Sequence, residues 1–148
     1  LRDGNKRQEI TGEQIRANGH EFGTTTGRPR RTGWLDLPLL RYAARVSGID
    51  GWALTKLDVL TGLPHVDVCV AYETEAGRTT EVVEGGRPVF ARMDGWSEDI
   101  GDARAIEDLP AAARALVALV ESETGIGCDL ISVGARRDQT ISLRPVFA

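Results

Sequence analysis

Apolar residues recur at helical spacing in the stretch that follows Asp36. Asp36 is a good N-cap residue, Pro38 is tolerated in a first helical turn, and Gly48 suits a C-terminal cap. The spacing predicts an amphipathic helix of about three turns with one buried face. That face is predicted to contain Leu39, Leu40, Ala43 and Val46, with Tyr42 as a further member.

A second helix is predicted after Asp108, because Pro110 suits a first turn and Gly125 suits a helix end. The apolar residues between them recur at three- and four-residue intervals, which is typical of a helix with one buried stripe. The predicted stripe is Leu109, Ala113, Leu116, Val117 and Val120.

Strand-like patterns fill much of the remaining chain. Residues 52–60 form a mainly apolar run, which is typical of a strand buried on both faces. Residues 66–72 alternate between two sets of side chains and predict a half-buried strand. Further strands are predicted over residues 79–83 (after a turn at Gly77), 88–92 (an edge strand), 129–134 and 139–144.

Helices and strands alternate in the first half of the chain, and hairpins appear in the second half. The predicted fold class is therefore α/β with antiparallel hairpin additions. We expect one domain over residues 1–148, with a polar lead-in over residues 1–18 that has weak helical character from Gly12 to Asn18. The chain contains neither an internal repeat nor a linker-like segment.

Composition narrows the classes of function. A chain of 148 residues with 41% hydrophobic and 27% charged residues is typical of a soluble globular domain. The net charge of −4 argues against a surface that binds nucleic acid by counterion release. No apolar run has membrane-spanning length, so no membrane partner is expected. Cys69 and Cys128 lie far apart and outside metal-ligand spacings, which favours a reducing compartment such as the cytoplasm.

The most unusual stretch runs from His20 to Trp34. It combines three consecutive threonines with three glycines and three arginines, so it suits neither a core strand nor a helix. Backbone N–H groups, hydroxyls and guanidinium groups in such a loop can converge on an anion, and arginine matches carboxylates and phosphates bidentately. A solvated basic turn is the alternative interpretation of the same composition.

Two further places are candidates for binding. Lys56 and Asp58 stand at the far end of an apolar strand, where open α/β sheets place ligand crevices. A carboxylate there can accept two hydrogen bonds from the ring N–H and exocyclic amine of guanine, while the lysine stem lies along the base. The stretch from Ser132 to Gly134 also follows an apolar strand, and its small residues allow close approach to a purine. The alternatives are a strand-end aspartate with a snorkelling lysine, and a simple strand-to-turn transition.

These stretches resemble the adenylosuccinate synthetase family. Residues 19–34 look like that family's aspartate-binding loop, and residues 54–60 (LTKLDVL) resemble its guanine motif, in the same order. Shorter matches at residues 68–72, 95–99 and 131–134 extend the resemblance from residue 19 to residue 144. The resemblance implies the carboxyl-terminal part of a P-loop-like, GTP-dependent ligase fold.

The resemblance also implies a reaction. In the family, inosine monophosphate (IMP) and L-aspartate condense to adenylosuccinate in AMP biosynthesis, while GTP is hydrolysed to GDP and phosphate with magnesium. The O6 atom of IMP is first phosphorylated, and the aspartate amine then displaces that phosphate. The expected partners are IMP, L-aspartate and GTP, and the full-length protein is expected to be a cytoplasmic homodimer.

Site residues carry over by motif. The loop expected to hold aspartate and IMP consists of Thr24, Thr25, Thr26, Gly27, Arg28, Pro29 and Arg30, with Arg30 also near GTP. The residues expected to frame guanine are Lys56, Leu57, Asp58, Ser132, Val133 and Gly134. Catalytic residues and magnesium contacts are expected upstream of this segment, because family members are much longer than this chain. This fragment alone is therefore expected to be inactive, and a non-catalytic guanine-nucleotide-binding or structural remnant is the alternative.

Overall fold

The computed structural model describes residues 12–145, and the chain forms two compact units that divide between Gly33 and Trp34. In the first unit, residues 12–18 are helical, which confirms the helical character predicted there. The loop predicted to bind aspartate follows this helix within the same unit. The rest of the predicted polar lead-in, residues 1–11, lies outside the described residues, as do residues 146–148.

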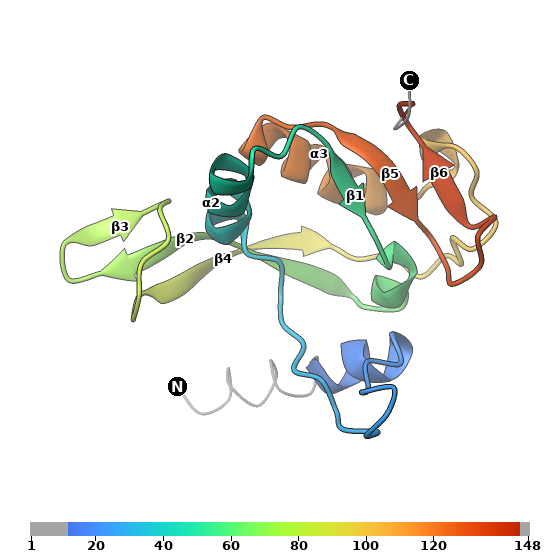
Figure 1. The fold of residues 1–148 in the computed structure, drawn as a ribbon, viewed down its shortest axis with the longest axis horizontal. Coiled ribbons are helices and arrows are strands. Elements are labelled where there is room, and N and C mark those ends of the chain that lie inside the picture. Colours follow the sequence, from blue (N-terminus) through green and yellow to red (C-terminus); the bar gives the residue numbers. More distant parts are fainter. Residues whose placement is uncertain (1–11, 146–148) are drawn as a thin grey trace. The chain divides into compact units, whose positions relative to one another are not determined.

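The second unit contains two small sheets, which Figure 1 shows as separate ribbons. One sheet has the order β1–β5–β6, with β1 and β5 parallel and β6 antiparallel to β5. The other has the order β3–β2–β4 and is antiparallel throughout. The strands are β1 (Trp52–Leu54), β2 (His65–Thr74), β3 (Gly77–Thr79), β4 (Arg87–Asp94), β5 (Cys128–Ser132) and β6 (Thr140–Ser142).

Two α-helices pack on these strands. Both ends of α2 and the end of α3 are where the sequence predicts them, but α3 begins at Ala111, with Pro110 as its N-cap residue rather than in its first turn. Helix α2 (Leu37–Ser47) contacts β2 and α3, and α3 (Ala111–Thr124) also contacts β4. Asp36 caps α2 by accepting the Leu39 N–H at 2.9 Å, and its other carboxylate oxygen accepts the Tyr72 hydroxyl. Two 3-10 turns, η1 (Leu57–Leu60) and η2 (Ile106–Asp108), complete the α/β fold, whose predicted class is confirmed.

The buried face of α2 differs from the predicted one. Leu39 and Val46 are 50% and 60% exposed, and Tyr42 is also exposed. The helix instead buries the stripe that begins at Leu37 and continues through Ala44, with Leu40 half-buried. Both stripes have helical spacing, so the apolar pattern alone does not determine which one packs inward. The stripe predicted for α3 is correct, and it begins with a fully buried Leu109 that precedes the helix.

Strand β2 is buried more completely than its alternating pattern predicts. The side expected to face solvent contains Asp67, Cys69 and Ala71, all of which are less than 9% exposed. Arg92 covers Asp67 by donating two hydrogen bonds to its carboxylate, at 2.8 and 3.0 Å. A β-bulge between Cys69 and Ala71 also interrupts the strict alternation.

The edge strand is close to its predicted position, but the hairpin is shifted. The turn predicted at Gly77 lies at residues 75–76, Gly77 begins β3, and Thr79 is the one residue of the predicted strand 79–83 that lies in a strand. Strand β4 is longer than residues 88–92 and lies at an edge of its sheet, as predicted.

One hydrophobic core joins the two sheets and α3. Its members come from segments far apart in the sequence, including strands, α2, α3 and the loops between them. Fully buried members include Leu37, Val68, Ile100, Leu109, Val117, Val120, Ile131, Val133 and Ile141. Among the described residues, no helix combines the length and apolar character needed to cross a bilayer.

The Asp67–Arg92 pair predicts a pH dependence of stability. Hydrogen bonding by the Arg92 guanidinium holds the pKa of the Asp67 carboxyl below its ordinary value, although burial partly opposes the shift. Because the folded pKa is depressed, the pair stabilises the fold above about pH 4 and loses this effect as the pH falls through the folded pKa. Asp67→Asn should therefore flatten the acid limb of a plot of unfolding free energy against pH. Urea unfolding from pH 2 to 7 would measure this, and an unchanged limb relative to Asp50→Asn, in an exposed loop, would contradict it.

Candidate functional site

The parallel pairing of β1 and β5 brings two of the predicted site segments together. Leu54 of β1 lies opposite Ile131 of β5, so the residues that follow both strands emerge at the same edge of the sheet. The Lys56 N–H donates to the Ser132 Oγ at 2.8 Å, which links the two segments directly. This is the carboxyl edge of a parallel pair, where α/β folds place ligand sites.

The strand predicted over residues 52–60 is correct only at its beginning. Strand β1 ends at Leu54, and Leu57–Leu60 form the 3-10 turn η1. Lys56 has a left-handed backbone with φ 61°, which ends the extended chain and turns it. Leu57 and Val59 are then buried beneath the turn, while Asp58 between them is only partly buried. The apolar run therefore anchors a turn rather than extending a strand.

Asp58 is the most distinctive group at this edge. Among the described residues, its Oδ1 atom is the single buried side-chain nitrogen or oxygen without a hydrogen-bond partner. A buried acceptor without a donor costs free energy, on the order of 1–3 kcal/mol. The protein itself covers this atom, so a ligand donor would reach it only after the turn moves.

The turn after β5 is closely packed. Val133 N–H donates to the Gln139 carbonyl at 2.9 Å, and the Gln139 side chain accepts the Arg136 N–H and donates to the Gly101 carbonyl. A Cβ atom on Gly134 would lie 2.3 Å from the Gln139 side chain, so a larger residue there would displace that side chain from its hydrogen bonds. The small residues of the predicted site thus permit the tight turn that holds Ser132 beside Lys56.

The loop predicted to bind aspartate lies in the first unit and forms a short hairpin. Phe22 and Pro29 form an antiparallel bridge, and the Gly23 N–H donates to the Arg28 carbonyl at 2.8 Å. Residues 24–26 turn at the tip, and Gly27 follows with φ 63°. All side chains from residue 24 to residue 30 are exposed. The predicted residues are therefore brought together on one exposed hairpin.

Two contacts hold the base of this hairpin. Arg30 donates to the Glu21 carboxylate at 3.2 Å, and its carbonyl accepts the Arg16 Nε–H at 2.6 Å. The Arg30 side chain remains 58% exposed, so this ion pair is one that a carboxylate ligand could replace.

Comparisons with known proteins identify the family of the chain. The family model of adenylosuccinate synthetase matches residues 4–141. The chain belongs to the adenylosuccinate synthetase family. It is 57% identical over 141 residues to the adenylosuccinate synthetase of Sorangium cellulosum and 47% identical over 141 residues to that of Thermobifida fusca. These matches cover 93% and 91% of this chain but 33% of each relative, so the chain spans about one third of their length.

A solved structure supports the same assignment of the fold. A fully ligated adenylosuccinate synthetase from Plasmodium falciparum matches with a TM-score of 0.85 and 34% sequence identity. The match covers 91% of this chain and 34% of that protein. This chain is thus a partial segment of the synthetase, with the mixed α/β fold that the sequence predicts.

Two residues that support the site are absent from the set predicted by sequence. Trp96 donates its indole Nε1–H to the Thr61 Oγ1 at 3.1 Å, directly after η1. The glycine and serine that flank Trp96 indicate a turn, but a tryptophan between turn residues is itself a signal of a buried anchor. Gln139, which packs against Gly134, has no comparable signal because it lies in a polar turn.

Proposed function

We propose that this segment supplies the guanine pocket and the aspartate-binding loop of an adenylosuccinate synthetase. The full reaction would be the GTP-dependent condensation of IMP with L-aspartate to adenylosuccinate, GDP and phosphate. The observation that carries the proposal is the buried, unpartnered Oδ1 of Asp58 at the carboxyl edge of β1 and β5. Family membership supports the reaction class.

Guanine is the base that fits Asp58. Its ring N–H and exocyclic amine present two adjacent donors, which match the two oxygens of a carboxylate. Adenine offers no such pair of donors on the equivalent edge, so Asp58 would select the base. Lys56 would flank the ring from one segment, above the buried Leu57. Ser132, Val133 and Gly134 would close the pocket from the other segment, Val133 through its backbone because its side chain is fully buried. The Ser132 hydroxyl already accepts the Lys56 N–H, so its contribution is first to hold the turn in place.

The exposed hairpin would hold the second substrate. Thr24, Thr25 and Thr26 offer hydroxyls and turn N–H groups, and the guanidinium groups of Arg28 and Arg30 suit the carboxylates of L-aspartate. Gly27 and Pro29 shape the backbone between these groups. A carboxylate of bound L-aspartate would compete with the Glu21 carboxylate for Arg30.

Magnesium, which the family reaction uses, is not assigned to this segment. In the part of the chain that the structure describes, no group of three or more His, Cys, Asp or Glu side chains is arranged to hold a metal ion. The bond-making groups, the homodimeric state and the cytoplasmic location belong to the proposal for the full-length protein.

A test of the guanine pocket is Asp58→Asn in the full-length synthetase that carries this segment. Hydrogen bonds to a charged acceptor contribute enough that GTP binding should weaken about 10- to 100-fold. Because asparagine both donates and accepts, the discrimination against inosine and xanthosine triphosphates should also relax. Steady-state kinetics with the three nucleotides would measure this, with Asp50→Asn as the control. Unchanged rejection of both analogues would show that Asp58 does not read the base.

A test of the hairpin is Arg30→Leu in the same enzyme. Loss of the guanidinium should raise the KM for L-aspartate about 10-fold or more, and far more than the KM for GTP. Arg31→Leu is a matched control, because Arg31 is an exposed neighbour outside the predicted set. Equal increases in both KM values would count against the assignment of Arg30 to aspartate.

A second candidate function is a non-catalytic binding module. Purified 148-residue chain should show no turnover when it is supplied with IMP, L-aspartate, GTP and magnesium. Adenylosuccinate formation, followed by its absorbance change, would contradict this expectation and place catalytic groups within the segment.

A further inference from the structure

The turn that carries Asp58 is held at both of its ends. At its beginning, the Lys56 N–H donates to Ser132. At its end, the Trp96 indole donates to Thr61, and the Gly62 N–H donates to the Trp96 carbonyl at 2.8 Å. Asp58 therefore sits in a short segment whose two ends are tied to different parts of the second unit.

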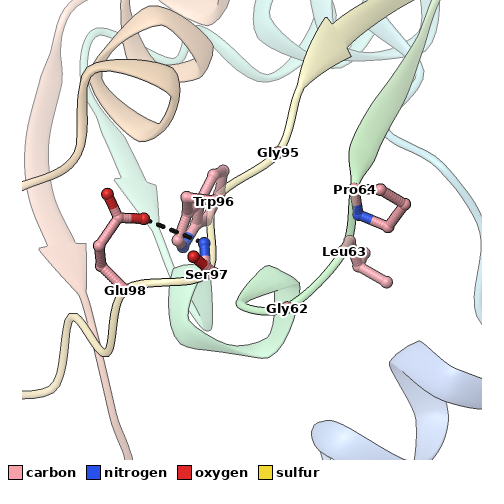
Figure 2. A pocket seen from close by; sticks show the side chains of 7 residues that line it. All are labelled: Gly62, Leu63, Pro64, Gly95, Trp96, Ser97 and Glu98. Carbon is pink, nitrogen blue, oxygen red and sulfur yellow. Dashed lines mark hydrogen bonds between the residues drawn. The ribbon is translucent and has the colours of Figure 1, made fainter.

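Trp96 lies in residues 95–98, a segment that backbone hydrogen bonds join to residues 62–64, which follow η1. Figure 2 shows residues 62–64 on one side and residues 95–98 on the other, lining a pocket of about 280 Å³. The Gly95 N–H donates to the Pro64 carbonyl at 3.2 Å. A Cβ on Gly95 would lie 1.8 Å from the Leu63 carbonyl oxygen, so the two backbones approach as closely as glycine allows. The indole is 4% exposed, so the position of Trp96 is fixed by burial as well.

We propose that Trp96 and Thr61 form a clamp that positions Asp58 for base selection. This inference rests on the proposed guanine pocket and adds two positioning residues to it. Neither side chain need touch the nucleotide. The clamp acts because η1 is only four residues long, so a shift at Thr61 moves the turn that carries Asp58. The carboxylate must meet two donors at once, and a small displacement weakens both hydrogen bonds.

The matched variants are Trp96→Phe and Thr61→Val. Trp96→Phe removes the indole donor and keeps most of the buried ring, and Thr61→Val removes the acceptor at nearly constant shape. The structure also supplies a control of the same chemistry. Trp52 donates its indole Nε1–H to the Thr124 Oγ1 at 3.0 Å, between β1 and the end of α3. Trp52→Phe thus removes an equivalent hydrogen bond that does not hold η1.

The experiment is calorimetric titration of the full-length synthetase with GTP and with inosine triphosphate, which lacks the exocyclic amine. We expect Trp96→Phe and Thr61→Val each to weaken GTP binding about 3- to 10-fold and to lower the preference for GTP over inosine triphosphate. The double variant should be no worse than the more affected single variant, because both remove the same hydrogen bond. In the two clamp variants, the KM for IMP, measured by steady-state kinetics, should stay unchanged. In Trp52→Phe, the preference for GTP over inosine triphosphate should stay unchanged.

The outcomes separate this inference from the function on which it rests. Retention of the full preference by both clamp variants would overturn the clamp. A similar loss of preference in Trp52→Phe would also overturn it, because the effect would then be general loss of stability. If Trp96→Phe fails to fold, Thr61→Val decides alone. If the unaltered protein shows no preference for GTP, the proposed guanine pocket itself fails, and the clamp fails with it.

Discussion

The parallel pairing of β1 with β5 is the constraint on which the second unit depends. It aligns the ends of two strands that are far apart in the sequence, and the Lys56–Ser132 hydrogen bond spans those ends. Without this register, the lysine–aspartate turn and the small-residue turn would be unrelated loops. With it, the turn that carries Asp58 and the glycine-containing turn after β5 leave the sheet at the same edge. The antiparallel additions, β6 on one sheet and the β3–β2–β4 sheet, enclose the core behind that edge.

Much of this arrangement can be predicted from the sequence because local chemistry dictates it. The N-cap at Asp36, the C-caps at Gly48 and Gly125 and the stripe of α3 depend on residues close together in the chain. The binding segments can be located because glycine, threonine and arginine in one loop, or a charged pair after an apolar run, are unusual combinations. The family resemblance then gives these segments their expected ligands, and the family is confirmed.

Other features could not be predicted because they depend on contacts between distant segments. Helix α2 has two apolar stripes of similar spacing, and only the surrounding chain decides that Leu37 and Ala44, rather than Leu39 and Val46, are buried. The apolar run after Trp52 gives no sign that Lys56 adopts a left-handed backbone and starts a turn. The bond between the Trp96 and Thr61 side chains joins residues far apart in the sequence, and neither residue's neighbours reveal the other.

The unpartnered oxygen of Asp58 is the feature on which the proposed binding role of this turn rests. A turn that existed only to reverse the chain would satisfy both carboxylate oxygens or expose them, because a buried acceptor without a donor lowers stability. Here Ser132 accepts from the Lys56 N–H and Thr61 accepts from the Trp96 indole, and these bonds hold the turn without involving the Asp58 carboxylate. The neighbours therefore fix the turn and leave one acceptor without a donor. A segment that gives up stability in this way is more consistent with a nucleotide-binding turn than with a remnant that is only structural, because a donor from the ligand would offset that cost.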